Sequence, residues 1–133
     1  MHMYMTYARQ GNKEALVALK RKMIDVGMRK LEVNPDDAVT LSRIAGPLGE
    51  FGEREKALEL LERVIRLSPD DGLIMYNAAC GYSTLGEIER AIECLKNAAR
   101  LGYKNTGEWI KSDPDLEPVR KHPMYQSIIE GFK

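Results

Sequence analysis

Few side chains in this sequence of 133 residues could act as nucleophiles, bases or metal ligands. Its two cysteines, Cys80 and Cys94, form neither a CxxC motif nor another metal-ligand spacing. Of its histidines, we assign His2 no chemistry, and His122 precedes Pro123, a position that suits entry into a helix. No Ser–His–acid set, phosphate-binding glycine-rich loop or metal cluster can be assembled. We therefore predict no enzymatic activity, no cofactor and no metal site.

Two features could still carry chemistry: the thiol of Cys80 and the basic run Lys20–Lys22. Cys80 would be a nucleophile only if a basic neighbour or a helix N-terminus lowered its pKa, and the sequence indicates neither. A structural thiol is therefore favoured. The basic run Lys20–Lys22 could contact nucleic acid, but no aromatic residue alternates with the charges, as single-strand binding requires. A solvated helix face is the favoured interpretation, and a nucleic-acid contact would instead show a steep salt dependence.

The charges balance overall, with 20 basic and 20 acidic residues, so no net field attracts nucleic acid or a membrane surface. Residues 1–31 carry a net charge of +5 and residues 32–71 a net charge of −5, which we interpret as a basic helix beside an acidic repeat. No apolar run approaches the roughly 20 residues that cross a bilayer. Residues 1–11 lack the apolar centre of a signal peptide. We expect a cytoplasmic protein with free thiols.

The elements that position these side chains repeat along the chain. Residues 38–71 and 72–105 carry similar residue types at positions 34 apart. The matching pairs include Ala45 and Ala79, Gly52 and Gly86, Ala57 and Ala91, and Leu61 and Leu95. A 34-residue period with small, aromatic and glycine positions resembles the tetratricopeptide repeat family. The resemblance implies an all-α fold, a single α-α superhelix (solenoid) of antiparallel helix pairs.

Apolar periodicity and capping residues predict the individual helices. We expect them over residues 12–33, 38–49, 53–67, 72–85 and 87–101. A motif at 34–37, Asn-Pro-Asp-Asp, recurs at 68–71 as Ser-Pro-Asp-Asp, and each copy ends one helix and starts the next. Gly27 costs its helix about 1 kcal/mol, so we expect a neighbouring helix to approach closely there. Pro47 cannot bond to the carbonyl of Arg43, which predicts either a tolerated kink or a carbonyl that faces a ligand.

The two ends of the chain depart from the repeat. We interpret residues 1–37 as a partial first repeat with a long second helix, in which Tyr4–Gln10 would be the end of a first helix. Residues 106–133 are predicted to cap the other end with a capping helix over about 123–132. A short helix over 106–111, and then a tight turn or a single helical turn over 112–118, would precede it.

A narrower resemblance rests on three motifs in order along the chain. They are Asn34-Pro35-Asp36-Asp37, then Tyr76-Asn77-Ala78-Ala79-Cys80, then a longer motif from Trp109 to Tyr125 that contains Asp113-Pro114-Asp115-Leu116. Together they resemble the tetratricopeptide region at the C-terminus of prokaryotic multidomain proteins, including some with adenylate-cyclase or protein-kinase domains. The resemblance implies an interaction module of a larger signalling protein.

In the tetratricopeptide fold the first helix of each pair lines a concave groove. Carried over position by position, the resemblance implies these groove-facing candidates: Val39, Ser42, Arg43, Gly46 and Glu50, then Leu73, Tyr76, Asn77, Cys80 and Thr84. Arg43 and Asn77 are equivalent, and a guanidinium beside an amide suits a carboxylate or a peptide backbone. Equally, both side chains could be solvated or could bond to adjacent helices. Chaperone-binding members need Asn in place of Arg43 and basic residues in place of Leu73 and Asn77, so we do not expect binding of a chaperone tail.

The expected function is a non-catalytic scaffold that binds a peptide or helix of a partner protein in this groove. The alternative is homo-oligomerisation through the N-terminal edge of the first repeat, which would expose Tyr4 and Tyr7.

Overall fold

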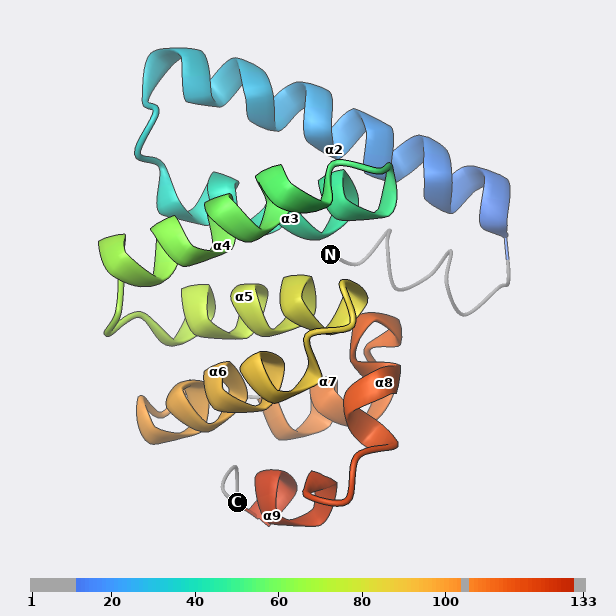
Figure 1. Ribbon diagram of the computed structural model, residues 1–133, viewed down its shortest axis with the longest axis vertical. Coiled ribbons are helices and arrows are strands. Elements are labelled where there is room, and N and C mark those ends of the chain that lie inside the picture. Colours follow the sequence, from blue (N-terminus) through green and yellow to red (C-terminus); the bar gives the residue numbers. More distant parts are fainter. Residues whose placement is uncertain (1–11, 104–105, 131–133) are drawn as a thin grey trace.

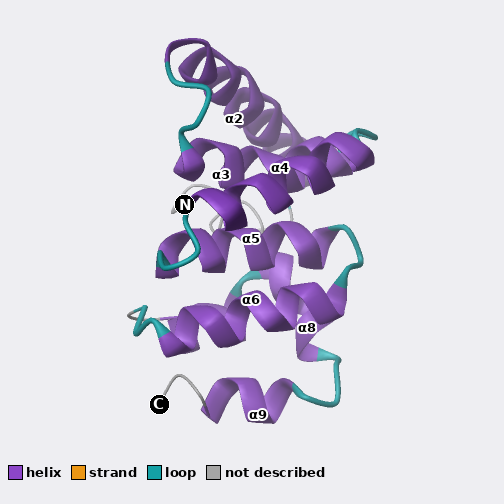
Figure 2. Cartoon of the chain, turned by 60° about the vertical axis from the view of Figure 1, so that its left-hand side comes forward, coloured by secondary structure: helices purple, strands orange, loops and turns teal. Residues whose placement is uncertain are grey.

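The helix bounds follow the predicted pattern closely. The computed structural model describes residues 12–103 and 106–130, so the predicted helix end at Tyr4–Gln10 lies outside the described residues. Its elements are α2 (Lys13–Val33), α3 (Ala38–Glu50), α4 (Arg54–Leu67), α5 (Gly72–Thr84), α6 (Ile88–Arg100), α7 (Thr106–Ser112), η1 (Pro114–Leu116), α8 (Glu117–Arg120) and α9 (Tyr125–Glu130). Figure 2 shows helices and loops, and no strand, across these ranges.

Side-chain caps start three of the helices. Asn12 accepts the amide of Ala15 at 3.0 Å and so caps α2. Asp37 and Asp71, the last residues of the two repeated motifs, accept the amides of the third residue of α3 and α5 at 3.3 and 3.2 Å. These bonds satisfy amides that have no partner within the helix, which confirms the predicted role of the motifs.

The helices form antiparallel pairs that stack along one direction. In Figure 1, α2 crosses one end of the stack, the pairs α3–α4 and α5–α6 follow, and α7 to α9 close the other end. Gly52 and Gly86 connect the two helices of each pair, with φ of 93° and 80°. This left-handed conformation is available to glycine at little cost, which explains glycine in both copies of the turn. The all-α superhelix predicted from the repeat is confirmed.

Small residues bring the helices of the stack close together. Ala45, Ala57, Ala79 and Ala91 are all 0% exposed. Gly27 of α2 faces α3 so closely that a Cβ atom there would lie 2.5 Å from Cγ2 of Ile44. The predicted close approach is therefore confirmed. α3 continues past Pro47 to Glu50, so the helix accommodates this proline three residues before its end.

The C-terminal segment seals the last helix pair. Ile110, Leu116 and Val119 are 0% exposed and Ile128 is 2% exposed, and all four belong to the hydrophobic core. The last helix, predicted over about 123–132, lies within that range and begins at Tyr125. A turn precedes it, in which the amides of Met124 and Tyr125 bond to the side chain and the carbonyl of His122.

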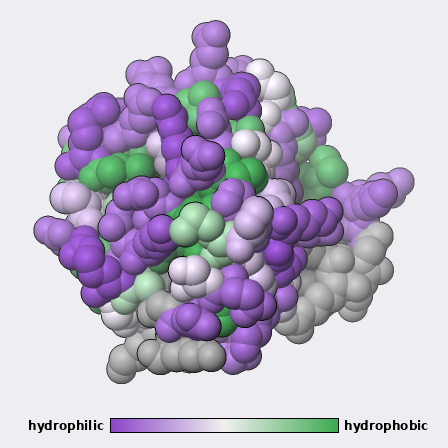
Figure 3. All heavy atoms as spheres, turned by 60° about the horizontal axis from the view of Figure 1, so that its bottom comes forward, coloured by the Kyte–Doolittle hydropathy of each residue, from purple (hydrophilic) through white to green (hydrophobic). Residues whose placement is uncertain are grey.

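Hydrophilic residues predominate on the face that includes this end, and hydrophobic residues form small separate patches there (Figure 3). Among the described helices, none combines the length and the apolar character needed to cross a membrane.

Candidate functional site

A small pocket opens between α2, α3, α5 and η1. Its volume is about 50 Å³, enough for a few water molecules or a short side chain. Residues of α2, α3, α5 and η1 line it: Lys20, Met23, Ser42, Arg43, Gly46, Pro47, Glu50, Asn77, Cys80, Gly81, Thr84 and Asp115. Seven of these residues were predicted from the sequence to face the groove, and the structure brings them together.

Arg43 is the free charge of this pocket. Its side chain is exposed, and no carboxylate of the described residues forms an ion pair with it. A guanidinium is always charged at physiological pH and has five N–H donors in a fixed plane, which favours planar acceptors such as carboxylates. The pocket therefore presents a cation that can bind an acidic group without first breaking an existing ion pair.

Asn77, the equivalent of Arg43 in the next repeat, serves the packing of the helices. It is 7% exposed, and its Nδ2 donates to Ser42 Oγ at 3.2 Å. Ser42 in turn donates to the carbonyl of Val39 at 2.8 Å. This chain of hydrogen bonds ties α5 to α3, so Asn77 and Ser42 hold the pocket wall in place. The sequence left open whether Asn77 would face a ligand or would be solvated or bond to an adjacent helix. The structure shows the bond to an adjacent helix.

An ion pair borders the pocket on the side of α2. Lys20 Nζ lies 2.6 Å from Glu50 Oε2, and the two side chains are 12% and 31% exposed. Partial burial strengthens such a pair relative to one in open solvent. A second cavity of about 390 Å³ shares both residues and extends from them to Pro118 and Lys121. The concave side therefore continues past the ion pair towards α8.

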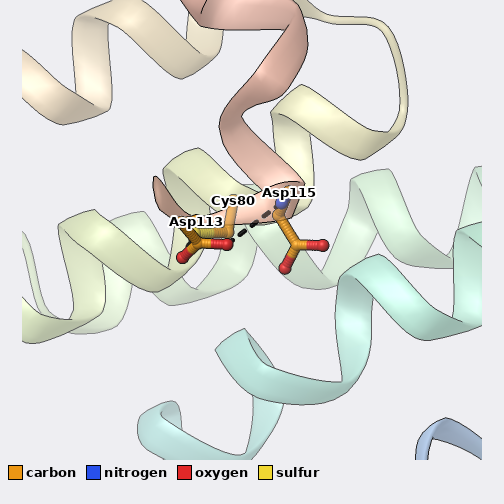
Figure 4. A group of neighbouring side chains, drawn as sticks. All are labelled: Cys80, Asp113 and Asp115. Carbon is orange, nitrogen blue, oxygen red and sulfur yellow. Dashed lines mark hydrogen bonds between the residues drawn. The ribbon is translucent and has the colours of Figure 1, made fainter. Parts of the chain in front are cut away.

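The chain's own C-terminal segment fills the groove beside Tyr76. Tyr76 is 0% exposed, and its hydroxyl donates to Asp113 Oδ2 at 2.8 Å. Cys80 Sγ lies 3.7 Å from the same oxygen, and the amide of Asp115 donates to Asp113 Oδ1 at 3.0 Å. Figure 4 shows the Cys80, Asp113 and Asp115 side chains gathered where α5 meets the segment that contains η1. The Tyr76 hydroxyl thus faces Asp113 of its own chain.

These surroundings make Cys80 a poor nucleophile. Burial, and next the negative charges of Asp113 and Asp115, raise the pKa of the Cys80 thiol well above its usual value. Burial is also the main cause of the raised pKa of Tyr76. Because the thiolate is the reactive form, Cys80 stays protonated and unreactive. The structural role predicted for this thiol fits its environment.

The same three residues offer ligand atoms that lie within 4.8 Å of one another, the usual first sign of a metal site. However, the two oxygens of Asp113 already accept from Tyr76, Cys80 and the amide of Asp115. A metal would have to replace these bonds and remove the thiol proton of Cys80. The geometry therefore matches a hydrogen-bonded cluster that fastens the closing segment to α5.

Arg120 fixes the shape of that segment. Its Nη1 donates to the carbonyls of Ile110 and Asp113 at 2.7 and 2.8 Å. Neither Asp113 nor Arg120 was predicted to contribute to the site. The only sequence signal was the Asp-Pro motif, which indicates a turn and cannot reveal the contact with α5.

The structure places the remaining three predicted residues outside this pocket. Val39 and Leu73 are half-buried and do not line the pocket, and Tyr76 is enclosed beneath Asp113. Cys94, on α6, is a free buried thiol like Cys80. Burial raises the pKa of Cys94 to about 12.

One segment of the chain matches a known protein family. Residues 74–101, which span most of α5 and all of α6, match the tetratricopeptide repeat family. No curated protein matches the chain. The matched segment coincides with the second helix pair, and the first pair carries similar residue types at several positions 34 residues earlier. The second helix pair therefore resembles a tetratricopeptide repeat, a module that generally mediates interactions between proteins.

Proposed function

We propose that this chain is a non-catalytic scaffold that binds a peptide or helix of a partner protein on its concave side. Arg43 carries this proposal, because it is an exposed cation at the mouth of a pocket and no described carboxylate pairs with it. An acidic side chain or a terminal carboxylate of the partner would pair with its guanidinium. The pocket has room for one short side chain, so the partner's acidic residue would be a local anchor within a longer contact.

The setting of the scaffold is a further part of the proposal. The motif from Trp109 to Tyr125 resembles the end of tetratricopeptide regions in prokaryotic signalling proteins, which supports a role as an interaction module of such a protein in the cytoplasm.

Self-association through the N-terminal edge is the second candidate. Val17, Val26 and Met28 of α2 are 39–42% exposed, which supports an interface there. However, α2 carries six basic residues against three acidic ones, a net charge of +3. Two copies that meet through this helix would bring like charges together, which favours a partner other than a second copy.

A peptide titration tests the proposal. Two pools of capped hexapeptides, one with Asp or Glu at a fixed position and one with Asn or Gln there, would be added to the protein while NMR records its amide signals. We expect the acidic pool to shift signals around Arg43 and to bind at least about tenfold more tightly than the neutral pool. Arg43→Glu should abolish this preference.

Lys96→Glu is the matched control, because it makes the same charge change at an exposed site on α6. It should leave the preference intact. Equal affinity for both pools, or the same loss in both variants, would refute the role of Arg43. Asn77 is unsuitable for this test, since its bond to Ser42 contributes to the packing of α5 on α3.

A further inference from the structure

Two parallel helices end beside the second cavity, the one of about 390 Å³ on the side of α8. α3 ends at Glu50 and α5 ends at Thr84, and these two residues, 34 positions apart, both line the cavity. In Figure 1, α3 and α5 run in the same direction and end on the side of the stack where α8 lies. The last carbonyls of a helix carry a partial negative charge, equivalent to about half an elementary charge. Two such negative ends therefore lie beside one space.

The two helices do not compensate this charge with residues of their own. The last turns of α2, α4 and α6 contain Lys30, Arg66 and Arg100, which stabilise a negative helix end. The last turns of α3 (residues 47–50) and α5 (residues 81–84) contain no basic residue. Lys20 of α2 reaches the end of α3, where its amine pairs with Glu50. A cation from another element thus already binds at one of the two ends.

Carboxylates also outnumber amines in the lining of the second cavity. Three carboxylates and two amines among the described residues give the lining a net formal charge of −1: Glu50, Asp115, Glu117, Lys20 and Lys121. Lys20 pairs with Glu50 at 2.6 Å, and Lys121 Nζ lies 3.5 Å from Glu117 Oε1. A carboxylate has two oxygens and can accept several donors, so it can bind a further cation beside its lysine. Together with the two helix ends, these charges favour a cation in the cavity.

A buried hydroxyl beside this cavity has no hydrogen-bond partner among the described residues. Ser83 of α5 lines the cavity and is 1% exposed, and it is the Oγ of this residue that makes no hydrogen bond. Its neighbour Thr84 donates to the carbonyl of Gly81 at 3.0 Å, which leaves the lone pairs of Thr84 Oγ1 as acceptors. Buried polar atoms are almost always hydrogen-bonded in folded proteins, so Ser83 indicates that a polar group binds there.

The second cavity continues the pocket at Arg43. The two linings share Lys20, Glu50, Thr84 and Asp115. Arg43 lies seven residues before Glu50 on α3, which at 1.5 Å per residue is about 10 Å along the helix. The concave side therefore offers a guanidinium at one point and a negatively charged cavity about 10 Å further on.

We propose that the bound segment of the partner is extended and carries an acidic and a basic residue three positions apart, the acidic side chain on Arg43 and the basic one in the second cavity. A chain of the polyproline type has three residues per turn and rises about 3.1 Å per residue, so side chains three positions apart lie on one side, about 9 Å from each other. The ammonium or guanidinium group donates to the carboxylates of Glu50 and Glu117 and to Ser83 Oγ. This inference rests on the proposed function, because Arg43 anchors the acidic residue, and it adds the second cavity as the site that recognises the basic one.

Capped hexapeptides test this motif. The first has Glu and Lys three positions apart, the second has Gln in place of Lys, and the third has the composition of the first with Glu and Lys adjacent. Each is made with Glu before Lys and with Lys before Glu, because the groove accepts a chain in either direction. Binding to the full chain is followed through the amide signals of Ser83 and Thr84 by NMR at low ionic strength. We expect the spaced peptide, in the better of its two orders, to bind at least about fivefold more tightly than the other two.

Glu117→Lys locates the basic residue of the peptide. Glu117 lines the second cavity but not the pocket at Arg43. Its charge reversal should abolish the advantage of the Lys peptide over the Gln peptide. Glu108→Lys is the matched control, because Glu108 lines neither cavity and, like Glu117, is an exposed glutamate that pairs with a lysine one helical turn further on. This control should keep the advantage, and thermal denaturation of the two variants should match.

Ser83→Ala tests the contact with the buried hydroxyl. It should reduce the advantage of the Lys peptide over the Gln peptide at least about threefold, because a hydrogen bond to a charged group is lost. The preference for acidic over neutral peptides should stay. Since the hydroxyl has no described partner in the free protein, its removal should not lower thermal stability. An unchanged advantage would contradict the place assigned to the basic residue.

The outcomes separate this inference from the proposed function. Equal binding of the Lys and Gln peptides, with the acidic preference at Arg43 intact, would overturn the inference and leave the proposed function standing. An acidic preference that Arg43→Glu leaves unchanged would overturn both. Capped lysine that binds as tightly as the spaced peptide would assign the second cavity to a small free cation. Affinity that rises at least about tenfold in Arg9→Gln would assign it to the chain's own N-terminal arginine. Either of these last two results would overturn the two-residue motif.

Discussion

The hydroxyl of Tyr76 donates a hydrogen bond to Asp113 at 2.8 Å, across 37 residues of sequence. The bond joins the first helix of the second pair to the segment that closes the stack, and both side chains are at most 1% exposed. The closing segment that this bond holds separates two regions. The part beside Tyr76 is filled by the chain itself, and the part between α2, α3 and the start of η1 stays open around Arg43.

Tyr76→Phe tests how much this hydrogen bond contributes to the free energy of unfolding. Asp113 would stay buried with one donor fewer, which costs about 1–3 kcal/mol in the free energy of unfolding. Urea unfolding measures the change. Tyr125→Phe, at a half-buried tyrosine of α9, is the control and should cost less. Equal costs in the two variants would mean that the Tyr76 hydroxyl contributes little.

Gly27→Ala should destabilise the protein although alanine favours helices by about 1 kcal/mol. The new methyl group would lie 2.5 Å from Ile44 Cγ2, so α2 and α3 would have to separate. We expect a net loss of roughly 1–3 kcal/mol in the free energy of unfolding. A gain in stability would show that α2 does not approach α3 as closely as the structure indicates.

Pro47→Ala should have the opposite effect. Proline at this position cannot donate to the carbonyl of Arg43, and alanine restores the donor within α3. We expect the free energy of unfolding to rise by about 1–3 kcal/mol, measured by urea unfolding. A loss of stability would indicate that the packing of the proline ring at the pocket wall stabilises the protein more than the restored hydrogen bond would.

Because of Cys94, we expect the free energy of unfolding to fall at alkaline pH. Burial raises the pKa of its thiol from the ordinary value of 9.0 to about 12 in the folded chain. The folded chain therefore holds this proton at pH values where the unfolded chain releases it. The contribution is complete below pH 9 and is lost as the pH rises towards 12.

The measurement is urea unfolding of the parent and Cys94→Ala at pH 8 and pH 10.5. The free energy of unfolding should fall more between these two values in the parent than in Cys94→Ala. Equal falls would show that other groups, such as the tyrosines, account for the whole dependence on pH.

The stack itself could be predicted from the sequence because its determinants are local or periodic. Gly52 and Gly86 mark the turns, Asp37 and Asp71 mark the helix starts, and the alanines 34 positions apart mark the buried seams. Each of these signals lies within a few residues of the element that it specifies, or recurs at a constant spacing, so no distant contact had to be known.

The site was less accessible to prediction, since it depends on contacts between distant segments. Position in the repeat placed Arg43 and Asn77 correctly on α3 and α5. It could not show that Asn77 bonds to Ser42, or that Asp113 reaches back to Tyr76 and fills part of the groove. These contacts depend on the path of the closing segment after α7, which breaks the repeat and therefore has no equivalent earlier in the chain.

A charge exchange at Arg43 tests the central claim most directly. The affinities of the parent and of Arg43→Glu would be measured for two capped hexapeptide pools that differ only in Glu or Lys at the fixed position. The account predicts that the parent prefers the Glu pool and that Arg43→Glu prefers the Lys pool, each by at least about tenfold, with unchanged thermal stability. If both proteins show the same preference, Arg43 does not anchor the partner and the account is contradicted.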